Sequence, residues 1–302
     1  MKPHIAIFTD DPGWHGRRLR RAFARRGCTT QSVSLRDCAL DLESPGGLHI
    51  PGFTRALPDA AFVRGVPGGT LEQVVLRLDV LHALQALDVP VYNRARAIEV
   101  SVDKAMTSLL LHQAGVPTPP TWAVESAARA RSLVLGETAR GHELVLKPLF
   151  GSQGKGLRRI ANPAELPPPQ DCNGVYYLQR YIGPPTGQGE DYRVLVVGDV
   201  ARAAMTRRGS GWIHNVALGA ACLPAPADAE LGELACAATR ALDMDYAGVD
   251  LMRAGDGRLM VIEVNSIPAW KGLQTQTGSD IAQMLVDDCL ARRMRPAMRQ
   301  QA

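Results

Sequence analysis

The 302-residue sequence is poor in lysine, in aromatic residues and in long apolar runs. No apolar run approaches the roughly 18 residues of a membrane-spanning helix, so we expect no membrane segment. The apolar stretch at residues 4–8 is too short for a secretion signal and is followed by acidic residues, which predicts a cytoplasmic protein. The six cysteines form no C-x-x-C pair, so we expect scattered reduced thiols and no zinc site.

Positive charge comes almost entirely from arginine, with 29 arginines against five lysines and a net charge of +4. This charge is too small to indicate a nucleic-acid partner, and an aromatic content of 5% makes stacking on bases a poor expectation. The arginine-rich helix predicted at residues 14–27 is most simply a solvated face. Salt-dependent binding of nucleic acid by this helix is the alternative. The few lysines are candidates for specific roles: Lys2, Lys104, Lys147, Lys155 and Lys271.

Apolar patterning predicts a soluble α/β protein built from two or three units, as expected for 302 residues with 46% hydrophobic and 21% charged residues. Residues 1–95 alternate strands and helices, which predicts a parallel α/β domain. Residues 96–183 and 184–302 are expected to form two α+β units. The predicted helices are 14–27, 71–87, 103–114, 228–242 and 279–292; the predicted strands are 4–8, 60–64, 89–92, 143–147, 156–160, 175–181, 192–197, 200–207, 246–253 and 258–265.

A glycine-rich loop follows the strand that ends at Lys147. It reads GSQGKG over residues 151–156. Glycines allow backbone N–H groups to approach a phosphate closely, and a lysine adds a point charge. The loop lacks both the G-x-x-x-x-G-K-[ST] pattern and the dinucleotide fingerprint. We interpret it as a phosphate-binding loop, with an ordinary glycine-rich hairpin turn as the alternative.

Acidic residues interrupt two apolar strands near the end of the chain. Asp250 lies in the first strand, and Glu263 and Asn265 share one face of the second. A two-residue turn at Asp256-Gly257 would place Asp250 directly opposite Glu263. Two buried carboxylates repel each other, and a divalent cation resolves this. With the amide oxygen of Asn265 they suit Mg²⁺; solvent-facing carboxylates on an open sheet are the alternative.

In order and spacing, these motifs resemble the ATP-grasp ligases, specifically the RimK-type glutamate ligases, over residues 91–292. The resemblance also includes a strand that comes directly before a Gly-Pro-Pro break. This strand segment could be a hinge that faces a flat ligand, or it could be an edge strand. The segments that carry the resemblance are VYNR (91–94), DK (103–104), VLK (145–147), GSQGKG (151–156), QRYI (179–182), DYRVLVVGD (191–199), AGVD (247–250) and EVNSIP (263–268).

The resemblance implies an ATP-grasp fold, with a parallel α/β domain followed by two α+β lobes that clamp ATP. It implies Mg²⁺ or Mn²⁺ at Asp250, Glu263 and Asn265, with Asn265 also counted among the catalytic residues. Arg193 and Arg207 would face an acyl phosphate or substrate carboxylate; surface arginines are the alternative, and Arg208 competes with Arg207 for the role. The implied nucleotide-binding residues are Lys104 and Lys147, the lid residues Gly151, Ser152, Gln153 and Gly154, the adenine-binding residues Gln179, Arg180, Tyr181 and Ile182, and Asp191 near the ribose.

The sequence departs from the family pattern around Asn215, a candidate substrate residue. Ile213 replaces the usual arginine, and the basic run that follows is missing. Downstream, Trp270 could stack on a planar acceptor and Lys271 could hold a carboxylate; a packed loop with a surface lysine is the alternative. This WKGLQ loop is similar to relatives associated with tetrahydromethanopterin or methanofuran cofactors.

The implied reaction uses ATP to phosphorylate a carboxylate, which an amine then attacks to give an amide, with ADP and phosphate released. We expect addition of an amino acid, L-glutamate, to a small cofactor-like acceptor such as a pterin or furan. The alternatives are a ligase that modifies a protein terminus and a nucleotide-binding protein without turnover. By resemblance alone, the expected assembly is a homodimer or homotetramer.

Overall fold

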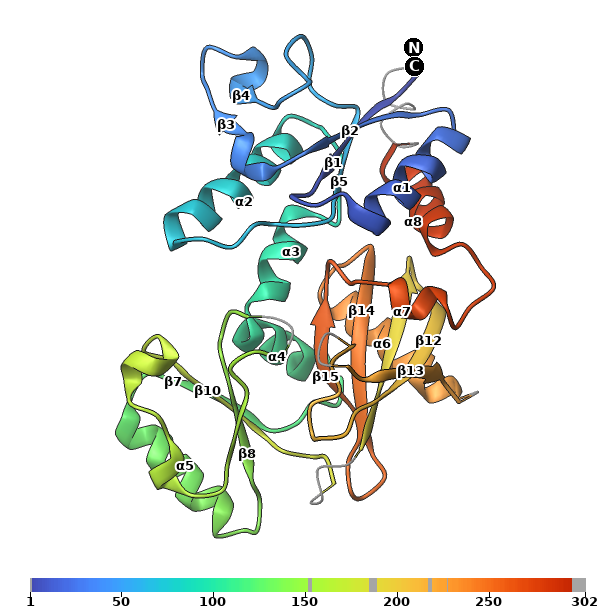
Figure 1. Cartoon of the computed structure of the whole chain (residues 1–302). Helices are drawn as coiled ribbons and strands as arrows, with labels where there is room; N and C mark the ends of the chain where they lie inside the picture. The colour runs from blue at the N-terminus through green and yellow to red at the C-terminus, as the bar shows by residue number, and fades with distance from the viewer. Residues whose placement is uncertain (1, 152–153, 185–188, 217–218, 227, 295–302) are drawn as a thin grey trace.

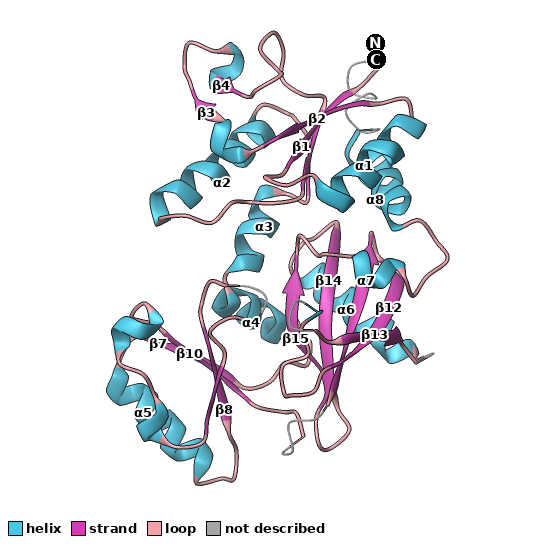
Figure 2. Ribbon diagram, viewed as in Figure 1, coloured by secondary structure: helices cyan, strands magenta, loops and turns pink. Residues whose placement is uncertain are grey.

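The computed structural model describes residues 2–151, 154–184, 189–216, 219–226 and 228–294. It contains three larger sheets, each within one of the three predicted ranges (Figures 1 and 2). No helix in the described residues is long and apolar enough to cross a membrane.

The N-terminal unit is built on a parallel sheet of order β2-β1-β5-β6. Its strands are β1 (His4–Phe8), β2 (Thr29–Val33), β5 (Ala60–Val63) and β6 (Val91–Tyr92), flanked by α1 (Gly13–Arg25) and α2 (Leu71–Ala86). A small antiparallel pair, β3 (Ala39–Leu40) and β4 (Leu48–His49), lies beside it. The parallel sheet predicted for residues 1–95 is therefore confirmed.

The middle lobe is an antiparallel sheet of order β7-β10-β8-β9 with helix α5 (Ala127–Thr138) packed against it. Its strands are β7 (Thr121–Val124), β8 (Leu144–Lys147), β9 (Arg158–Ile160) and β10 (Tyr176–Arg180). Two helices lead into this lobe, α3 (Ala95–Val102) and α4 (Lys104–Gln113). Their apolar residues Ala97, Val100 and Leu111 pack in the core of the C-terminal lobe, so this packing crosses the boundary predicted at residue 183.

The C-terminal lobe is an antiparallel sheet of order β13-β12-β11-β14-β15. Its strands are β11 (Glu190–Val197), β12 (Val200–Arg208), β13 (Ala221–Pro224), β14 (Tyr246–Arg253) and β15 (Leu259–Asn265). The helices of this part are α6 (Ala229–Ala241), α7 (Lys271–Gln274) and α8 (Ile281–Cys289). Together, the three units have the mixed α/β architecture that the sequence predicts.

The hairpin of β14 and β15 differs from the prediction at its turn. Arg253 pairs with Leu259, and Ala254 N–H donates to Arg258 O (2.9 Å), so the loop holds three residues, with Gly257 at φ 84°. The predicted two-residue turn is therefore wrong. A register shift between Asp250 and Leu251 compensates, because β15 carries one extra residue there. Asp250 consequently pairs with Glu263, as predicted.

Helix α8 returns to the N-terminal unit and lies beside α1 (Figure 1). Arg26 of the α1 C-cap donates two hydrogen bonds to Asp287 (2.6 and 2.7 Å), and Arg25 donates to Asp280 (3.0 Å). The predicted solvated face therefore also serves packing between the ends of the chain. Beneath it, Phe62, Tyr92 and Tyr246 join the two units in one core, with the two tyrosine rings stacked at 5.0 Å.

Replacing Leu285 of α8 with alanine tests this shared core. Leu285 is fully buried, so Leu285→Ala should cost about 2–5 kcal/mol of unfolding free energy. Leu135→Ala is the matched control, since Leu135 is 62% exposed on α5 and its loss should have little effect. Equilibrium unfolding in urea checks both variants. Equal midpoints for the two would contradict the role of α8 in the core.

Candidate active site

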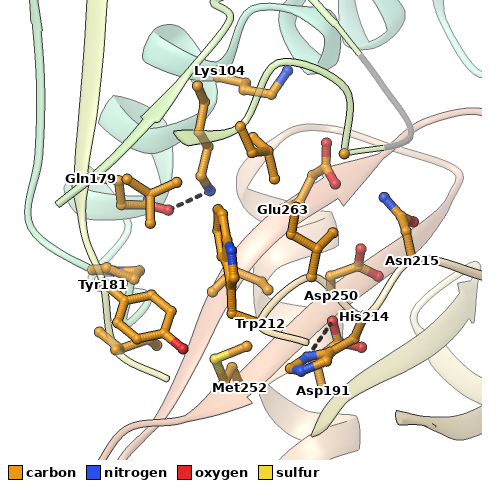
Figure 3. A pocket seen from close by; sticks show the side chains of 18 of the residues that line it. Lys104, Gln179, Tyr181, Asp191, Trp212, His214, Asn215, Asp250, Met252 and Glu263 are labelled. Carbon is orange, nitrogen blue, oxygen red and sulfur yellow. Dashed lines mark hydrogen bonds and ion pairs between the residues drawn. The ribbon is translucent and has the colours of Figure 1, made fainter. Parts of the chain in front are cut away.

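A pocket lies between the middle and C-terminal lobes and collects most of the predicted site residues (Figure 3). In the view, Lys104 and Gln179 lie on one side and Asp191, His214 and Asp250 on the other. The predicted residues that line it are Lys104, Lys147, Gly151, Gly154, Gln179, Arg180, Tyr181, Ile182, Asp191, Arg207, Asn215, Asp250 and Glu263. Ser152 and Gln153 fall outside the described residues.

The two predicted phosphate lysines are held by neighbouring polar groups. Asp103 caps α4 by accepting from the N–H groups of Ala105 and Met106, which places Lys104 in the first turn. Lys104 Nζ donates to Gly151 O at 2.8 Å and so ties the helix to the glycine loop. Burial lowers the pKa of Lys104. A β-carbon added at Gly156 of this loop would lie 2.8 Å from Pro148 Cγ, so the loop needs glycine there.

Lys147 ends β8 and points into the pocket beside β10. Its Nζ donates to Gln179 Oε1 at 2.6 Å, and Gln179 Nε2 in turn donates to Thr121 Oγ1 at 3.0 Å. Burial lowers the pKa of Lys147 to about 8. The side chain of Gln179 therefore orients a lysine, a role additional to the backbone contact that the sequence predicts for this residue. Tyr181, further along, packs under the guanidinium of Arg159 at 4.2 Å.

Asp250 is the most heavily paired of the predicted metal ligands. It is 2% exposed, and Arg193 donates to both its oxygens, from Nε at 2.6 Å and from Nη2 at 2.7 Å. Arg207 Nη2 adds a third contact at 2.9 Å. Burial disfavours the charged carboxylate, but the two guanidinium groups outweigh it and hold the pKa of Asp250 below its usual value.

Arg207 also holds Asp191, through Nε at 2.6 Å and Nη2 at 2.9 Å. Arg207 is 3% exposed, whereas Arg208 is exposed and pairs with Glu190. Arg207, and not Arg208, is therefore the arginine that faces the pocket. Arg193 is also largely buried, so the alternative of surface arginines is wrong for both residues. Burial opposes the charge of Arg207, yet Asp250 and Asp191 raise its pKa.

The predicted magnesium ligands lie on neighbouring strands and suit the ion by their chemistry. Asp250 and Glu263 are cross-strand partners, and the side-chain carboxylate of Glu263 makes no hydrogen bond or ion pair to another described residue. Asn265 Nδ2 donates to Gly248 O at 3.3 Å, which leaves its Oδ1 for another partner. Two carboxylates and an amide oxygen are hard ligands that suit Mg²⁺. The described residues hold no group of three or more His, Cys, Asp or Glu arranged for a metal. The bound phosphates and water would therefore complete the shell.

The structure does not support stacking of Trp270 on an acceptor. Trp270 is fully buried, with the Arg64 guanidinium 4.6 Å from its ring centroid and the His15 ring against it at 4.5 Å. Burial, together with Arg64 and Lys271, lowers the pKa of His15 to about 4, so Nε2 of the neutral ring accepts a hydrogen bond from the backbone N–H of Trp270 (3.2 Å). The packed loop is the correct alternative for Trp270. Lys271 is exposed, and its carboxylate-binding role stays a prediction.

His214 and Trp212 line the pocket, and sequence reasoning gave neither of them a role. His214 is buried, with Nδ1 3.7 Å from Asp191 Oδ2, and neither ring nitrogen has a hydrogen bond within the described part of the chain. Trp212 lines the pocket edge-on to Tyr181, with 6.1 Å between ring centroids. Both lie in the segment where the sequence departs from the family pattern, and that departure was their only signal.

Removing Arg193 should free Asp250 for a cation. Because Arg193 occupies both oxygens of Asp250, we expect Arg193→Gln to bind Mn²⁺ about tenfold more tightly without nucleotide, a change of about 1.4 kcal/mol. Arg202→Gln, at an exposed position of β12, is the control. Electron paramagnetic resonance of free Mn²⁺ measures both. Unchanged or weaker binding by Arg193→Gln would contradict competition between the guanidinium and the ion.

Comparison with known proteins shows which family this chain resembles. A family model described as a RimK-like ATP-grasp domain matches residues 101–289. The tetrahydromethanopterin:alpha-L-glutamate ligase of Methanococcus maripaludis is 36% identical over 236 residues, which cover 76% of this chain and 78% of that protein. The ribosomal protein bS6–L-glutamate ligase of Shigella boydii serotype 4 is 30% identical over 290 residues, covering 93% and 94%.

A similar fold is found in the ATP-grasp ligase PsnB, solved with a phosphomimetic variant of its minimal precursor, Mg and ADP. The TM-score is 0.70 at 18% identity, over 96% of this chain and 98% of that one. The expected fold and enzyme class, a ligase that forms C–N bonds, are thereby confirmed. The chain belongs to the RimK-like ATP-grasp family.

Proposed function

We propose that this protein is an ATP-dependent ligase that joins L-glutamate to a carboxylate of a reduced pterin cofactor of the tetrahydromethanopterin type. The observation that carries the proposal is the pocket in which two half-buried lysines, Lys104 and Lys147, face the Asp250–Glu263 pair. The names of the relatives from Methanococcus maripaludis, Methanocaldococcus jannaschii and Methanosarcina acetivorans support glutamate and the pterin acceptor.

The nucleotide would lie between the two lobes. Lys104 and Lys147 would bind its phosphates, and the strand end at 179–182 would hold the adenine. Asp191 would lie near the ribose. Mg²⁺, held by Asp250, Glu263 and Asn265, would neutralise phosphate charge.

The reaction needs positioning and charge neutralisation more than a protein nucleophile. The acceptor carboxylate attacks the γ-phosphorus of ATP, which forms an acyl phosphate and releases ADP. The glutamate amine then attacks the acyl carbon, phosphate leaves, and an amide remains. Arg207 and Arg193 are buried where they could stabilise the negative charge of these groups. The glycine loop would act as a lid that keeps water from the acyl phosphate.

The proposal also covers the acceptor, the assembly and the location of the protein. The protein-modifying ligase of Shigella boydii is less identical than the relative from Methanococcus maripaludis, 30% against 36%, which favours the small acceptor. The homodimer or homotetramer and the cytoplasmic location stay predictions.

Turnover should require glutamate, MgATP and the pterin together. We expect release of ADP, which a coupled assay measures, and a pterin heavier by one glutamyl residue, which mass spectrometry detects. Glu263→Gln should reduce kcat by at least about 100-fold, because it removes one carboxylate of the metal site. Glu233→Gln, exposed on α6, is the matched control and should remain active.

Other results of that assay would redirect the proposal. Glutamylation of a protein terminus or a furan cofactor, but not of the pterin, would replace the acceptor. Binding of MgATP with no ADP release in any mixture would favour a nucleotide-binding protein without turnover. Full activity of Glu263→Gln would remove Glu263 from the metal site.

Nucleotide affinity should fall as the pH rises above about 8. Because burial lowers the pKa of Lys147 to about 8 in the free protein, the side chain must take up a proton to bind phosphate above that pH. The apparent Kd of ATP should therefore rise by up to about tenfold per pH unit above about 8 and stay flat below. Titration calorimetry measures this, with adenosine as the phosphate-free control. The same slope in Lys147→Met would exclude this lysine as the cause.

A further inference from the structure

Asn93 joins the N-terminal unit to the hairpin that carries the candidate metal ligands. It directly follows β6 and is 1% exposed. All the hydrogen-bond partners of its side chain belong to the C-terminal lobe, at Asp245, Tyr246 and Ser266. In Figure 1 these ends of β14 and β15 point toward the N-terminal unit.

The side-chain amide of Asn93 makes four hydrogen bonds. Nδ2 donates to Tyr246 O and to Ser266 O, both at 2.8 Å. Oδ1 accepts from Asp245 N at 2.6 Å and from Tyr246 N at 3.0 Å. These contacts use both donors and both acceptor positions of the amide, so the geometry admits one orientation of this group.

These bonds continue a strand ladder beyond its end. The pairing of β14 with β15 ends at Gly248 and Asn265. Beyond it, Asn93 pairs with both the N–H and the C=O of Tyr246, as a residue of a neighbouring strand would. The same amide holds Ser266 O, and Ser266 directly follows the candidate metal ligand Asn265. Asn93 therefore connects the two strands at the point where their own pairing stops.

A second contact holds Ser266 from the other side. Ser101 and Ser266 share a hydrogen bond between their Oγ atoms at 2.6 Å, and Ser101 Oγ lies 2.8 Å from Ile98 O on α3. The chain after Ser266 is also close to β14, since a β-carbon on Gly248 would lie 2.6 Å from Pro268 Cβ. The segment that follows Asn265 is thus held by Asn93 at the Ser266 carbonyl, by Ser101 at the Ser266 hydroxyl, and by the close approach of Pro268 to Gly248.

We propose that Asn93, assisted by Ser101, is a positioning residue of the metal site that sets the place of Asn265 without touching metal or substrate. The inference rests on the proposed metal role of Asp250, Glu263 and Asn265. Partners outside the ligand shell orient metal ligands, and their loss weakens metal binding by about 10–100-fold. An amide that holds the backbone next to a ligand belongs to this class of partner.

The test compares Asn93→Ser and Ser101→Ala with Tyr92→Phe. Tyr92 is the matched control because its hydroxyl joins the same two units, through Asp288 at 2.8 Å, without contacting the hairpin ends. Mn²⁺ affinity is measured by electron paramagnetic resonance with a non-hydrolysable ATP analogue. Affinity for the analogue without metal and the thermal midpoint are measured beside it.

Asn93→Ser should weaken Mn²⁺ binding by at least about tenfold, and Ser101→Ala by about threefold. Metal-free affinity for the analogue should change less than about twofold in both, because its lysine contacts belong to other elements. Tyr92→Phe should lower the thermal midpoint and leave Mn²⁺ affinity unchanged.

Two results would overturn the inference. The first is a lower thermal midpoint in Asn93→Ser with unchanged Mn²⁺ affinity, which would be a purely structural effect. The second applies if Asn93→Ser does not fold, and it is unchanged Mn²⁺ affinity in Ser101→Ala. Failure of the proposed function is distinguishable, because Asn265→Ala would then bind Mn²⁺ as the unmodified protein does.

Discussion

The buried ion-pair network of Asp250, Arg193, Arg207 and Asp191 is the interaction on which the site depends. Arg193 is the register partner of Asp250, and Asp191 is the register partner of Arg207. Two carboxylates and two guanidinium groups thus meet across three adjacent strands, and their charges balance. A buried charge left without its partner is strongly destabilising, so the two arginines stabilise the folded sheet with Asp250 in it. A divalent cation that binds Asp250 must therefore share or displace a guanidinium.

Each of the three units contributes to the candidate site. The middle lobe supplies Lys147 and the strand end at 179–182, and the C-terminal lobe supplies the acidic hairpin and the arginines. The N-terminal unit supports the C-terminal lobe through the aromatic contact of Tyr92 with Tyr246, the packing of α8 on α1, and the side-chain amide of Asn93. The strands that carry Asp250 and Glu263 are consequently anchored at one end by the N-terminal unit and face the middle lobe across the pocket.

Sequence patterns predicted the parts of this structure that depend on local periodicity. The pairing of Asp250 with Glu263 follows from two strands with a short turn, and an extra residue in β15 preserved it although the turn was wrong. Helix α5 and strand β7 were missed, because α5 buries few apolar side chains and β7 is short and half-exposed. The burial of Trp270 depends on Arg64 and His15, which are both more than two hundred residues away in sequence. No local pattern could reveal that contact, nor the choice of Arg207 over Arg208, which their ion-pair partners decide.

The replacement of the family arginine by Ile213 does not leave the pocket short of positive charge. Five cationic side chains line it (Lys104, Lys147, Lys155, Arg180 and Arg207), against the three carboxylates of Asp191, Asp250 and Glu263. Arg180 is bound to Glu137 and Arg207 to two carboxylates, whereas the three lysines have no carboxylate partner among the described residues. A nucleoside triphosphate bound with a divalent ion would suit this balance of lining charges. The ion adds positive charge beside Glu263, whereas Ile213 adds no charge. With Ile213 in place of an arginine, the lysines and a bound ion would carry more of the neutralisation of phosphate.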